Sequence, residues 1–267
     1  VVLPTVAIDD LTEKCAYSCM KYAPSAEIII IADQAPDKDH PLQSLTTVFP
    51  NLTIASKRNL AARLSTRCIL AFIDSDAYPA PTWLEKAIEL FKTYPEYVAV
   101  AGPNIAPPSE PFDQELVGKV ETSNFITVNA HYIKKPSKPR EVQVMPSCNF
   151  LIRKKAFMHI GMMNESLSGG EDFELCARMR KEKWPIRYDG AVVVFHKSRN
   201  LTSFLKKRLS YGGFAFDNIL KNFSIPIFIT ICPAFFILFM VSFPIVLIND
   251  FYAHFYIAVM ITFSTIC

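Results

Sequence analysis

The chain has 267 residues, of which 51% are hydrophobic and 20% are charged, and its formal net charge is +3 at pH 7. This length allows one domain of about 200 residues with a smaller appendage. The small net charge does not favour nucleic acid as a partner. The odd number of cysteines, seven, argues against a disulfide framework.

Apolar runs alternate with helical periodicities as far as about residue 195. The predicted strands lie at 1–3, 27–32, 68–73, 97–101 and 190–195, and the predicted helices at about 11–22, 57–66, 83–93 and 171–183. This alternation is typical of a doubly wound α/β fold. The stretch 103–145 begins rich in proline and is expected to be a less regular insert, a loop over the site. Because no glycine-rich phosphate loop is found, a bound nucleotide would have to be held by side chains and a metal.

Two carboxylates, in Asp74-Ser75-Asp76, directly follow the apolar run 68–73. In an open α/β sheet, ligands bind at the carboxyl ends of the strands. Paired acidic side chains at that position suit a hard divalent cation, which in turn suits a diphosphate. The alternative is a polar turn in which Asp76 and Pro79 simply end the strand.

A second acidic motif, Gly169-Gly170-Glu171-Asp172, opens the predicted helix 171–183. Carboxylates are favourable in a first helical turn through the helix dipole, and this explains many acidic helix starts. The functional interpretation is that one of the two acids is a general base, held near a substrate hydroxyl by the rigid helix end.

The C-terminal part of the chain is the most apolar. No charged residue occurs from 222 to 249, and the run 225–248 could cross a hydrocarbon core of roughly 30 Å as a helix. The predicted organisation is a catalytic domain at 1–200, a basic juxtamembrane segment at 201–222 and a transmembrane hairpin at 223–267 whose second span is truncated. Basic residues before the first span predict a multi-pass membrane protein with its large domain in the cytosol. The missing initial methionine and the abrupt C-terminus predict a fragment.

Taken in order, these segments resemble family 2 glycosyltransferases of the GT-A fold over nearly the whole chain. The resemblance rests on Val1-Val2-Leu3-Pro4-Thr5, the second strand ending at Asp33, Ser56-Lys57-Arg58-Asn59, Asp74-Ser75-Asp76, Pro146-Ser147-Cys148-Asn149, Gly170-Glu171-Asp172 and His196. It implies an α/β fold with a Rossmann-like mixed sheet flanked by helices and followed by transmembrane helices. A departure from the family pattern is Ala32-Asp33-Gln34-Ala35, which replaces paired aspartates followed by glycine and serine.

The resemblance also implies a role for each polar residue of these motifs. The expected contacts to the nucleotide-sugar are Thr5, Asp33, Arg58, Asp74 and Asp76, and the expected ligands of Mg²⁺ or Mn²⁺ are Asp76, Asp74 and His196. Asp172 would be the base that accepts the proton of the acceptor hydroxyl, and Glu171 would orient Asp172 or hold the acceptor. For His196 the alternative is a strand-end histidine that is hydrogen-bonded to the backbone.

The implied activity is inverting, metal-dependent transfer of a hexosyl or related sugar. The sugar would pass from a nucleotide-diphosphate sugar to a hydroxyl of a saccharide or lipid-linked saccharide, at the cytosolic membrane face. Such products fit cell-envelope polysaccharide biosynthesis, and the basic juxtamembrane cluster suits anionic membrane lipid. The Gln-x-x-Arg-Trp signature of processive synthases is absent from the sequence, which favours transfer of a single sugar. The alternatives are transfer to a polyprenyl phosphate, a non-catalytic membrane-tethered scaffold, and an unrelated doubly wound domain with acidic turns.

Overall fold

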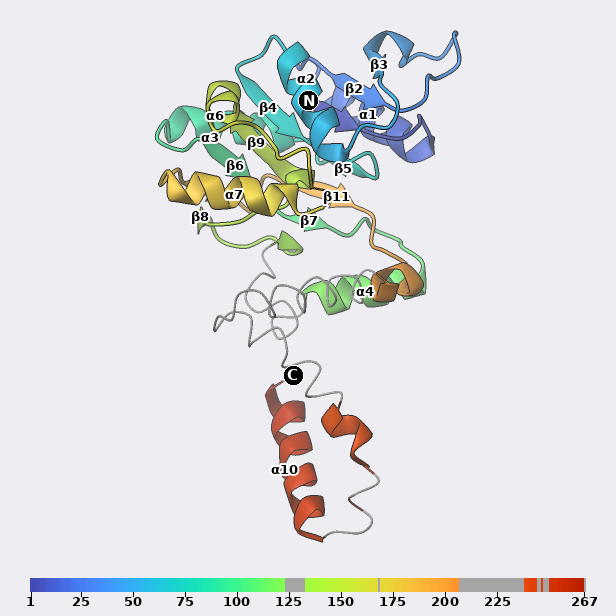
Figure 1. The fold of residues 1–267 in the computed structure, drawn as a ribbon, viewed down its shortest axis with the longest axis vertical. Coiled ribbons are helices and arrows are strands. Elements are labelled where there is room, and N and C mark those ends of the chain that lie inside the picture. The colour runs from blue at the N-terminus through green and yellow to red at the C-terminus, as the bar shows by residue number, and fades with distance from the viewer. Residues whose placement is uncertain (123–132, 168, 207–237, 244–245, 247–249, 267) are drawn as a thin grey trace. The chain divides into compact units, whose positions relative to one another are not determined.

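A computed structural model describes residues 1–122, 133–167, 169–206, 238–243, 246 and 250–266 (Figure 1). The chain divides into two compact units, Val1–Ser198 and Arg199–Cys267. The N-terminal unit contains all of the residues that the sequence predicts to act on substrate or metal.

An eight-stranded sheet forms the centre of the N-terminal unit, in the order β3-β2-β1-β4-β9-β6-β10-β8. Its strands are β1 (Val2–Pro4), β2 (Ile29–Ala32), β3 (Thr46–Val48), β4 (Ile69–Phe72), β6 (Ala99–Ala101), β8 (Arg140–Val142), β9 (Phe150–Arg153) and β10 (Ile186–Tyr188). Strands β1 to β4 pair in parallel and so do β6 and β10, whereas β9 runs antiparallel to β4 and β6 and β8 runs antiparallel to β10. The sheet is therefore mixed, with the antiparallel β9 at its centre.

A small second sheet lies at the carboxyl side of β4. It has the order β5-β11-β7 and contains β5 (Ala77–Pro79), β7 (Asn104–Ile105) and β11 (Val194–His196). Strand β11 is antiparallel to β5, and the register pairs His196 with Ala77. This pairing brings the end of β11 beside the turn that follows β4.

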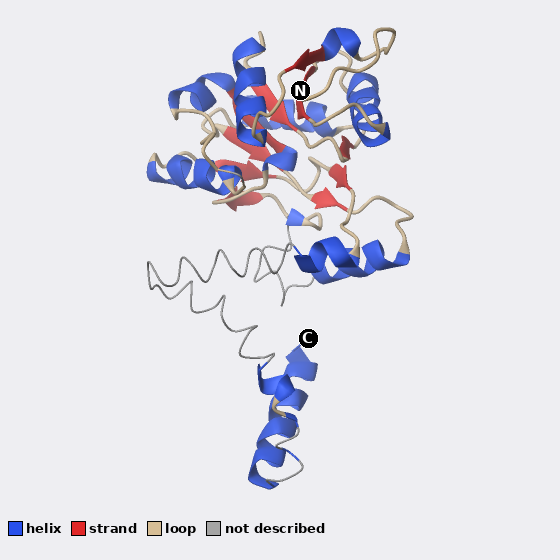
Figure 2. Ribbon diagram, turned by 45° about the vertical axis from the view of Figure 1, so that its right-hand side comes forward, coloured by secondary structure: helices blue, strands red, loops and turns tan. Residues whose placement is uncertain are grey.

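Helices cover both faces of the large sheet (Figure 2). They are α1 (Asp10–Tyr22), α2 (Ile54–Leu64), α3 (Trp83–Thr93), α6 (Lys154–His159) and α7 (Glu171–Lys181), with short 3₁₀ turns η1 (Gln43–Leu45) and η3 (Ser147–Asn149). Helix α4 (Phe112–Thr122) lies apart from this sheet (Figure 1). Successive strand residues point to opposite faces, so β4 gives Phe72 to a core with α2, α6 and α7, and Ala71 to a core with α1 and α3. Both faces of the sheet are thus buried, which explains the continuous apolar strand runs.

Three local predictions need correction. The predicted strand 190–195 is β11, which begins four residues later, and β10 before it was not predicted. The stretch 103–145, expected to be an irregular insert, contains β7, α4 and β8. Helix α2 begins at Ile54 rather than at 57, because the side chain of Thr53 accepts a hydrogen bond from the Ser56 amide and caps the helix.

The C-terminal unit contains the helix α10 (Asp250–Ile266), which coincides with the predicted second span. Among the described residues, no helix combines the length and the hydropathy that a membrane crossing requires. Most of the predicted first span, 225–248, and most of the basic segment 201–222 lie outside the described residues.

Candidate functional site

Polar side chains converge where β4 and β11 end. Asp74 and Asp76 lie in the turn between β4 and β5, and His196 is the last residue of β11. The His196 Nε2 atom lies 3.4 Å from Asp76 Oδ1, with the Asp76 side chain 47% exposed and that of His196 11% exposed. The structure therefore brings together the three residues that the sequence predicts to be metal ligands.

Helix α2 contributes two buried cations to the same region. The Lys57 ammonium group donates to Asp33 Oδ2 over 2.7 Å and to the Thr5 carbonyl oxygen over 2.6 Å. The Arg58 guanidinium donates through Nη2 to Asp74 Oδ1 over 2.6 Å and through Nη1 to Glu171 Oε1 over 2.7 Å.

The sequence does not predict these contacts. Arg58 lies inside α2 rather than at its start and pairs with two acids. Glu171 is buried against Arg58. Lys57 was missed as a site residue, although it stands beside Arg58 in the motif. It is 1% exposed, and a buried charge of this kind needs a partner of opposite charge.

The second acidic residue of the Glu171-Asp172 pair is held at the N-terminus of α7. Gly170 precedes the helix with φ of 76°, a left-handed conformation that glycine adopts without strain. Asp172 Oδ2 accepts a hydrogen bond from the Ser147 amide over 3.1 Å. Burial raises the pKa of the Asp172 carboxyl above its ordinary value, and the negative charge of Glu171 raises it further. A carboxylate with a raised pKa is a stronger base, as proton abstraction requires.

Asn149 connects the segments that carry the site. Its amide group donates to the carbonyl oxygens of Pro103 and Val192 over 3.1 and 2.7 Å, and its carbonyl oxygen accepts from Trp83 Nε1 over 2.8 Å. All of these contacts are buried, and they use both N–H groups of the amide and one acceptor position of its oxygen in positioning. Asn149 was missed as a positioning residue because its partners lie more than 40 residues away in the sequence.

The donor set at the strand ends fits a divalent cation. Two carboxylates and one imidazole are ligands of Mg²⁺ or Mn²⁺ type sites. The His196 Nδ1 atom is buried without a hydrogen-bond partner among the described residues. Arg58 uses only one oxygen of Asp74.

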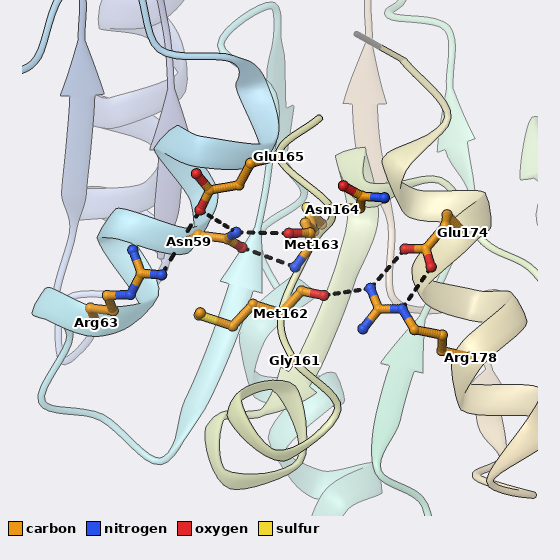
Figure 3. Close-up of a pocket in the computed structure, with 9 residues that line it drawn as sticks. All are labelled: Asn59, Arg63, Gly161, Met162, Met163, Asn164, Glu165, Glu174 and Arg178. Atoms are coloured by element: carbon orange, nitrogen blue, oxygen red, sulfur yellow. Dashed lines mark hydrogen bonds and ion pairs between the residues drawn. The ribbon is translucent and has the colours of Figure 1, made fainter. Parts of the chain in front are cut away.

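A depression of about 440 Å³ lies elsewhere, between α2, the segment 161–165 and α7 (Figure 3). Its charged groups are paired within the chain. Glu165 accepts from Ser56 Oγ and Asn59 Nδ2 over 2.9 and 2.8 Å, and Arg178 forms an ion pair with Glu174. This network joins the segment that leads to Glu171 onto α2, so we assign it a structural role.

Comparisons with known proteins agree with this architecture. The model of glycosyl transferase family 2 matches residues 1–161. Pre-mycofactocin glycosyltransferase from two strains of Mycobacterium tuberculosis, CDC 1551 / Oshkosh and H37Rv, is 28% identical over 163 residues, which cover 60% of this chain and 34% of the relative. The chain thus spans about a third of the length of these curated relatives.

Two solved structures share the fold at 16% sequence identity. One is GalNAc-T7, with a TM-score of 0.54 and coverage of 74% of this chain and 44% of that one. The other is the mannosyltransferase PcManGT from Pyrobaculum calidifontis, with a TM-score of 0.56 and coverage of 85% and 65%. The mixed sheet flanked by helices is accordingly of the GT-A type. Since the family model covers more than half of the sequence, the chain belongs to glycosyl transferase family 2.

Proposed function

We propose that this protein transfers a sugar from a nucleotide-diphosphate sugar to a hydroxyl group of a saccharide or lipid-linked saccharide, with inversion at the anomeric carbon. The observation that supports this best is the bridge made by Arg58. It contacts Asp74 of the acidic turn and Glu171, the neighbour of Asp172, at 2.6 and 2.7 Å. One buried side chain therefore links a predicted metal ligand to the residue next to the predicted base.

The nucleotide side of the proposal rests on Asp33 and on the structural neighbours. Asp33 Oδ2 is paired with Lys57, whereas Oδ1 is buried with no hydrogen-bond partner among the described residues. A buried acceptor without a partner is costly, and an N–H group of a nucleobase would satisfy it. The two neighbours were solved with UDP, GalNAc and Mn²⁺ and with GDP-Man and Mn²⁺.

Asp76, Asp74 and His196 would hold Mg²⁺ or Mn²⁺. When bound, such an ion offsets the negative charge that develops on the leaving diphosphate. Asp76 is the more accessible of the two carboxylates, at 47% against 33% exposed side chain, and would face the diphosphate. Arg58 keeps Asp74 in place through its contact with the Asp74 Oδ1 atom.

Asp172 would act on the acceptor. Its carboxylate takes the proton of the acceptor hydroxyl while the hydroxyl oxygen bonds to the anomeric carbon. The bond from that carbon to the diphosphate oxygen breaks in the same displacement, and the diphosphate leaves with the electron pair. The Ser147 amide orients the carboxylate for this transfer. Removal of a general base of this kind typically lowers the rate by about 10²–10⁴-fold.

We also propose that the C-terminal unit attaches the protein to a membrane, with the catalytic unit on the cytosolic side. The apolar helix α10 and the uncharged run 222–249 support this. Two hydrophobic segments would also suit a polyprenyl phosphate as the acceptor, but a phosphate is already ionised and would not need Asp172 as its base. Alkaline extraction of membranes tests the attachment, because release of the full chain into the supernatant would contradict it.

The test of the activity is turnover of a panel of nucleotide-sugars by the detergent-solubilised full chain, with Mn²⁺ or EDTA. We expect one donor to be consumed only with metal, and consumption to be lost in Asp172→Asn and Asp76→Asn. The matched control is Asp10→Asn, an exposed acid in the first turn of α1. Turnover that survives in Asp172→Asn would contradict the assigned base. Failure of every donor to bind would contradict the activity.

A further inference from the structure

Three atoms of different ligand types meet beneath the acidic turn. One carboxylate oxygen of Asp74, the Sγ atom of Cys148 and a ring nitrogen of His196 all lie within 4.8 Å of one another. The topology explains this meeting. Strands β4 and β9 are antiparallel with Phe72 opposite Phe150, so the turn after β4, which contains Asp74, lies beside η3, the 3₁₀ turn before β9, which contains Cys148.

Cys148 differs from the other ligands in hardness. Its thiol is buried, with 4% of the residue exposed, and it faces the turn where a hard oxygen-binding cation is proposed. A buried cysteine next to apolar groups is ordinarily a small hydrophobe. Here it faces a carboxylate and an imidazole instead, and the His196 Nδ1 atom is buried without a partner among the described residues.

We propose that Asp74, Cys148 and His196 form a binding site for a thiophilic divalent cation of the zinc and cadmium class. Sulfur and imidazole ligands select such ions over Mg²⁺. In a tetrahedral zinc site, with metal–sulfur bonds of about 2.3 Å and metal–nitrogen bonds of about 2.0 Å, the ligand atoms lie roughly 3.3–3.8 Å apart. The three side chains would therefore close by about 1 Å around the ion, and the fourth position would be open to water.

The cation would replace the thiol proton, so binding releases one proton to the solvent for each thiolate formed. The site shares Asp74 and His196 with the proposed Mg²⁺ or Mn²⁺ site. On the proposed function, occupancy by zinc would therefore compete with the ion that activates the sugar donor, and zinc would inhibit transfer.

The test uses Co²⁺ as a spectroscopic substitute for zinc in the metal-free full chain. Exposed Cys68 is replaced by alanine in every variant to prevent coordination at the surface. We expect a near-ultraviolet sulfur-to-cobalt charge-transfer band that Zn²⁺ abolishes, and loss of this band in Cys148→Ala. The matched control is Cys15→Ala, because Cys15 is also buried and lies 3.6 Å from the Asp74 carbonyl oxygen but is outside the three-ligand cluster.

A band that persists in Cys148→Ala, or no band in the parent protein, would overturn the proposal. If circular dichroism shows that Cys148→Ala does not fold, the zinc affinity of His196→Gln, measured by calorimetry against the parent protein, tests the proposal instead. An affinity at least about tenfold weaker, or about 1.4 kcal/mol, supports the site, and an unchanged affinity overturns it. Neither readout involves sugar transfer, so failure here leaves the donor-turnover test of the proposed function unaffected.

Discussion

Replacement of Arg58 by methionine should destabilise the N-terminal unit strongly. Arg58 is 2% exposed and donates to both Asp74 and Glu171. Removing one partner of a buried ion pair costs about 3–5 kcal/mol, because the other charge stays buried and unpaired. This value applies to Glu171, whose side chain is 11% exposed. The Asp74 side chain is 33% exposed, so its lost contact adds about 1 kcal/mol or less.

The measurement is the free energy of unfolding from urea titration of the full chain, followed by circular dichroism. A total loss of about 3–6 kcal/mol corresponds to a fall in Tm of about 6–24 °C, at about 2–4 °C per kcal/mol for a domain of this size. The matched control is Arg63→Met on the same helix. The Arg63 side chain is 52% exposed and 3.9 Å from Glu165, so its loss should cost less than about 1 kcal/mol.

Two further results would decide the interpretation. In the Arg58→Met background, Glu171→Gln should recover part of the lost stability, because it removes the unpaired charge. If Arg58→Met costs no more than Arg63→Met, the reasoning about the buried pair is refuted.

Three other predictions concern Asp172, Glu165 and the glycines at 102 and 169. Because burial raises the pKa of Asp172, kcat should begin to fall at a higher pH than it would with an exposed aspartate as the base, and a pH–rate profile tests this. The raised pKa also means that the ionised carboxylate destabilises the fold at neutral pH, so Asp172→Asn should increase the free energy of unfolding in urea titration. Glu165→Ala removes two hydrogen bonds to α2 and should cost about 1–3 kcal/mol in urea titration. In Gly102→Ala the new Cβ would lie 1.8 Å from the Val192 carbonyl oxygen, so Tm should fall sharply, whereas Gly169→Ala, with open space around it, should leave Tm nearly unchanged.

Local signals in the sequence predicted the layers of the fold correctly. The apolar runs at 27–32 and 68–73 are β2 and β4, and the helix predicted at 83–93 is α3. The signal behind them is hydrophobic periodicity, which depends on residues close in the chain. The three residues of β10 escaped detection because Arg187 interrupts a run too short to show alternation.

The sequence indicated which residues of the candidate site would meet, but it did not indicate most of the contacts between them. Asp74, Asp76 and His196 were expected to meet, and they do. The pairing of Arg58 with Glu171 joins residues 113 apart in the sequence, and Cys148 comes near Asp74 through the pairing of β4 with β9. Such contacts depend on strand order, which composition and local pattern do not encode.

The contacts of α2 have a consequence for tolerance to insertion and deletion. Adjacent residues of this helix, Lys57 and Arg58, serve three acids on different elements, and Ser56 and Asn59 hold the segment before α7. One added residue rotates the following helix by about 100° and shifts it by about 1.5 Å. A single-codon insertion between 54 and 57 would therefore separate all three acids from their cations at once. We expect a library of such insertions to be depleted in α2 while remaining populated in the loop 133–139.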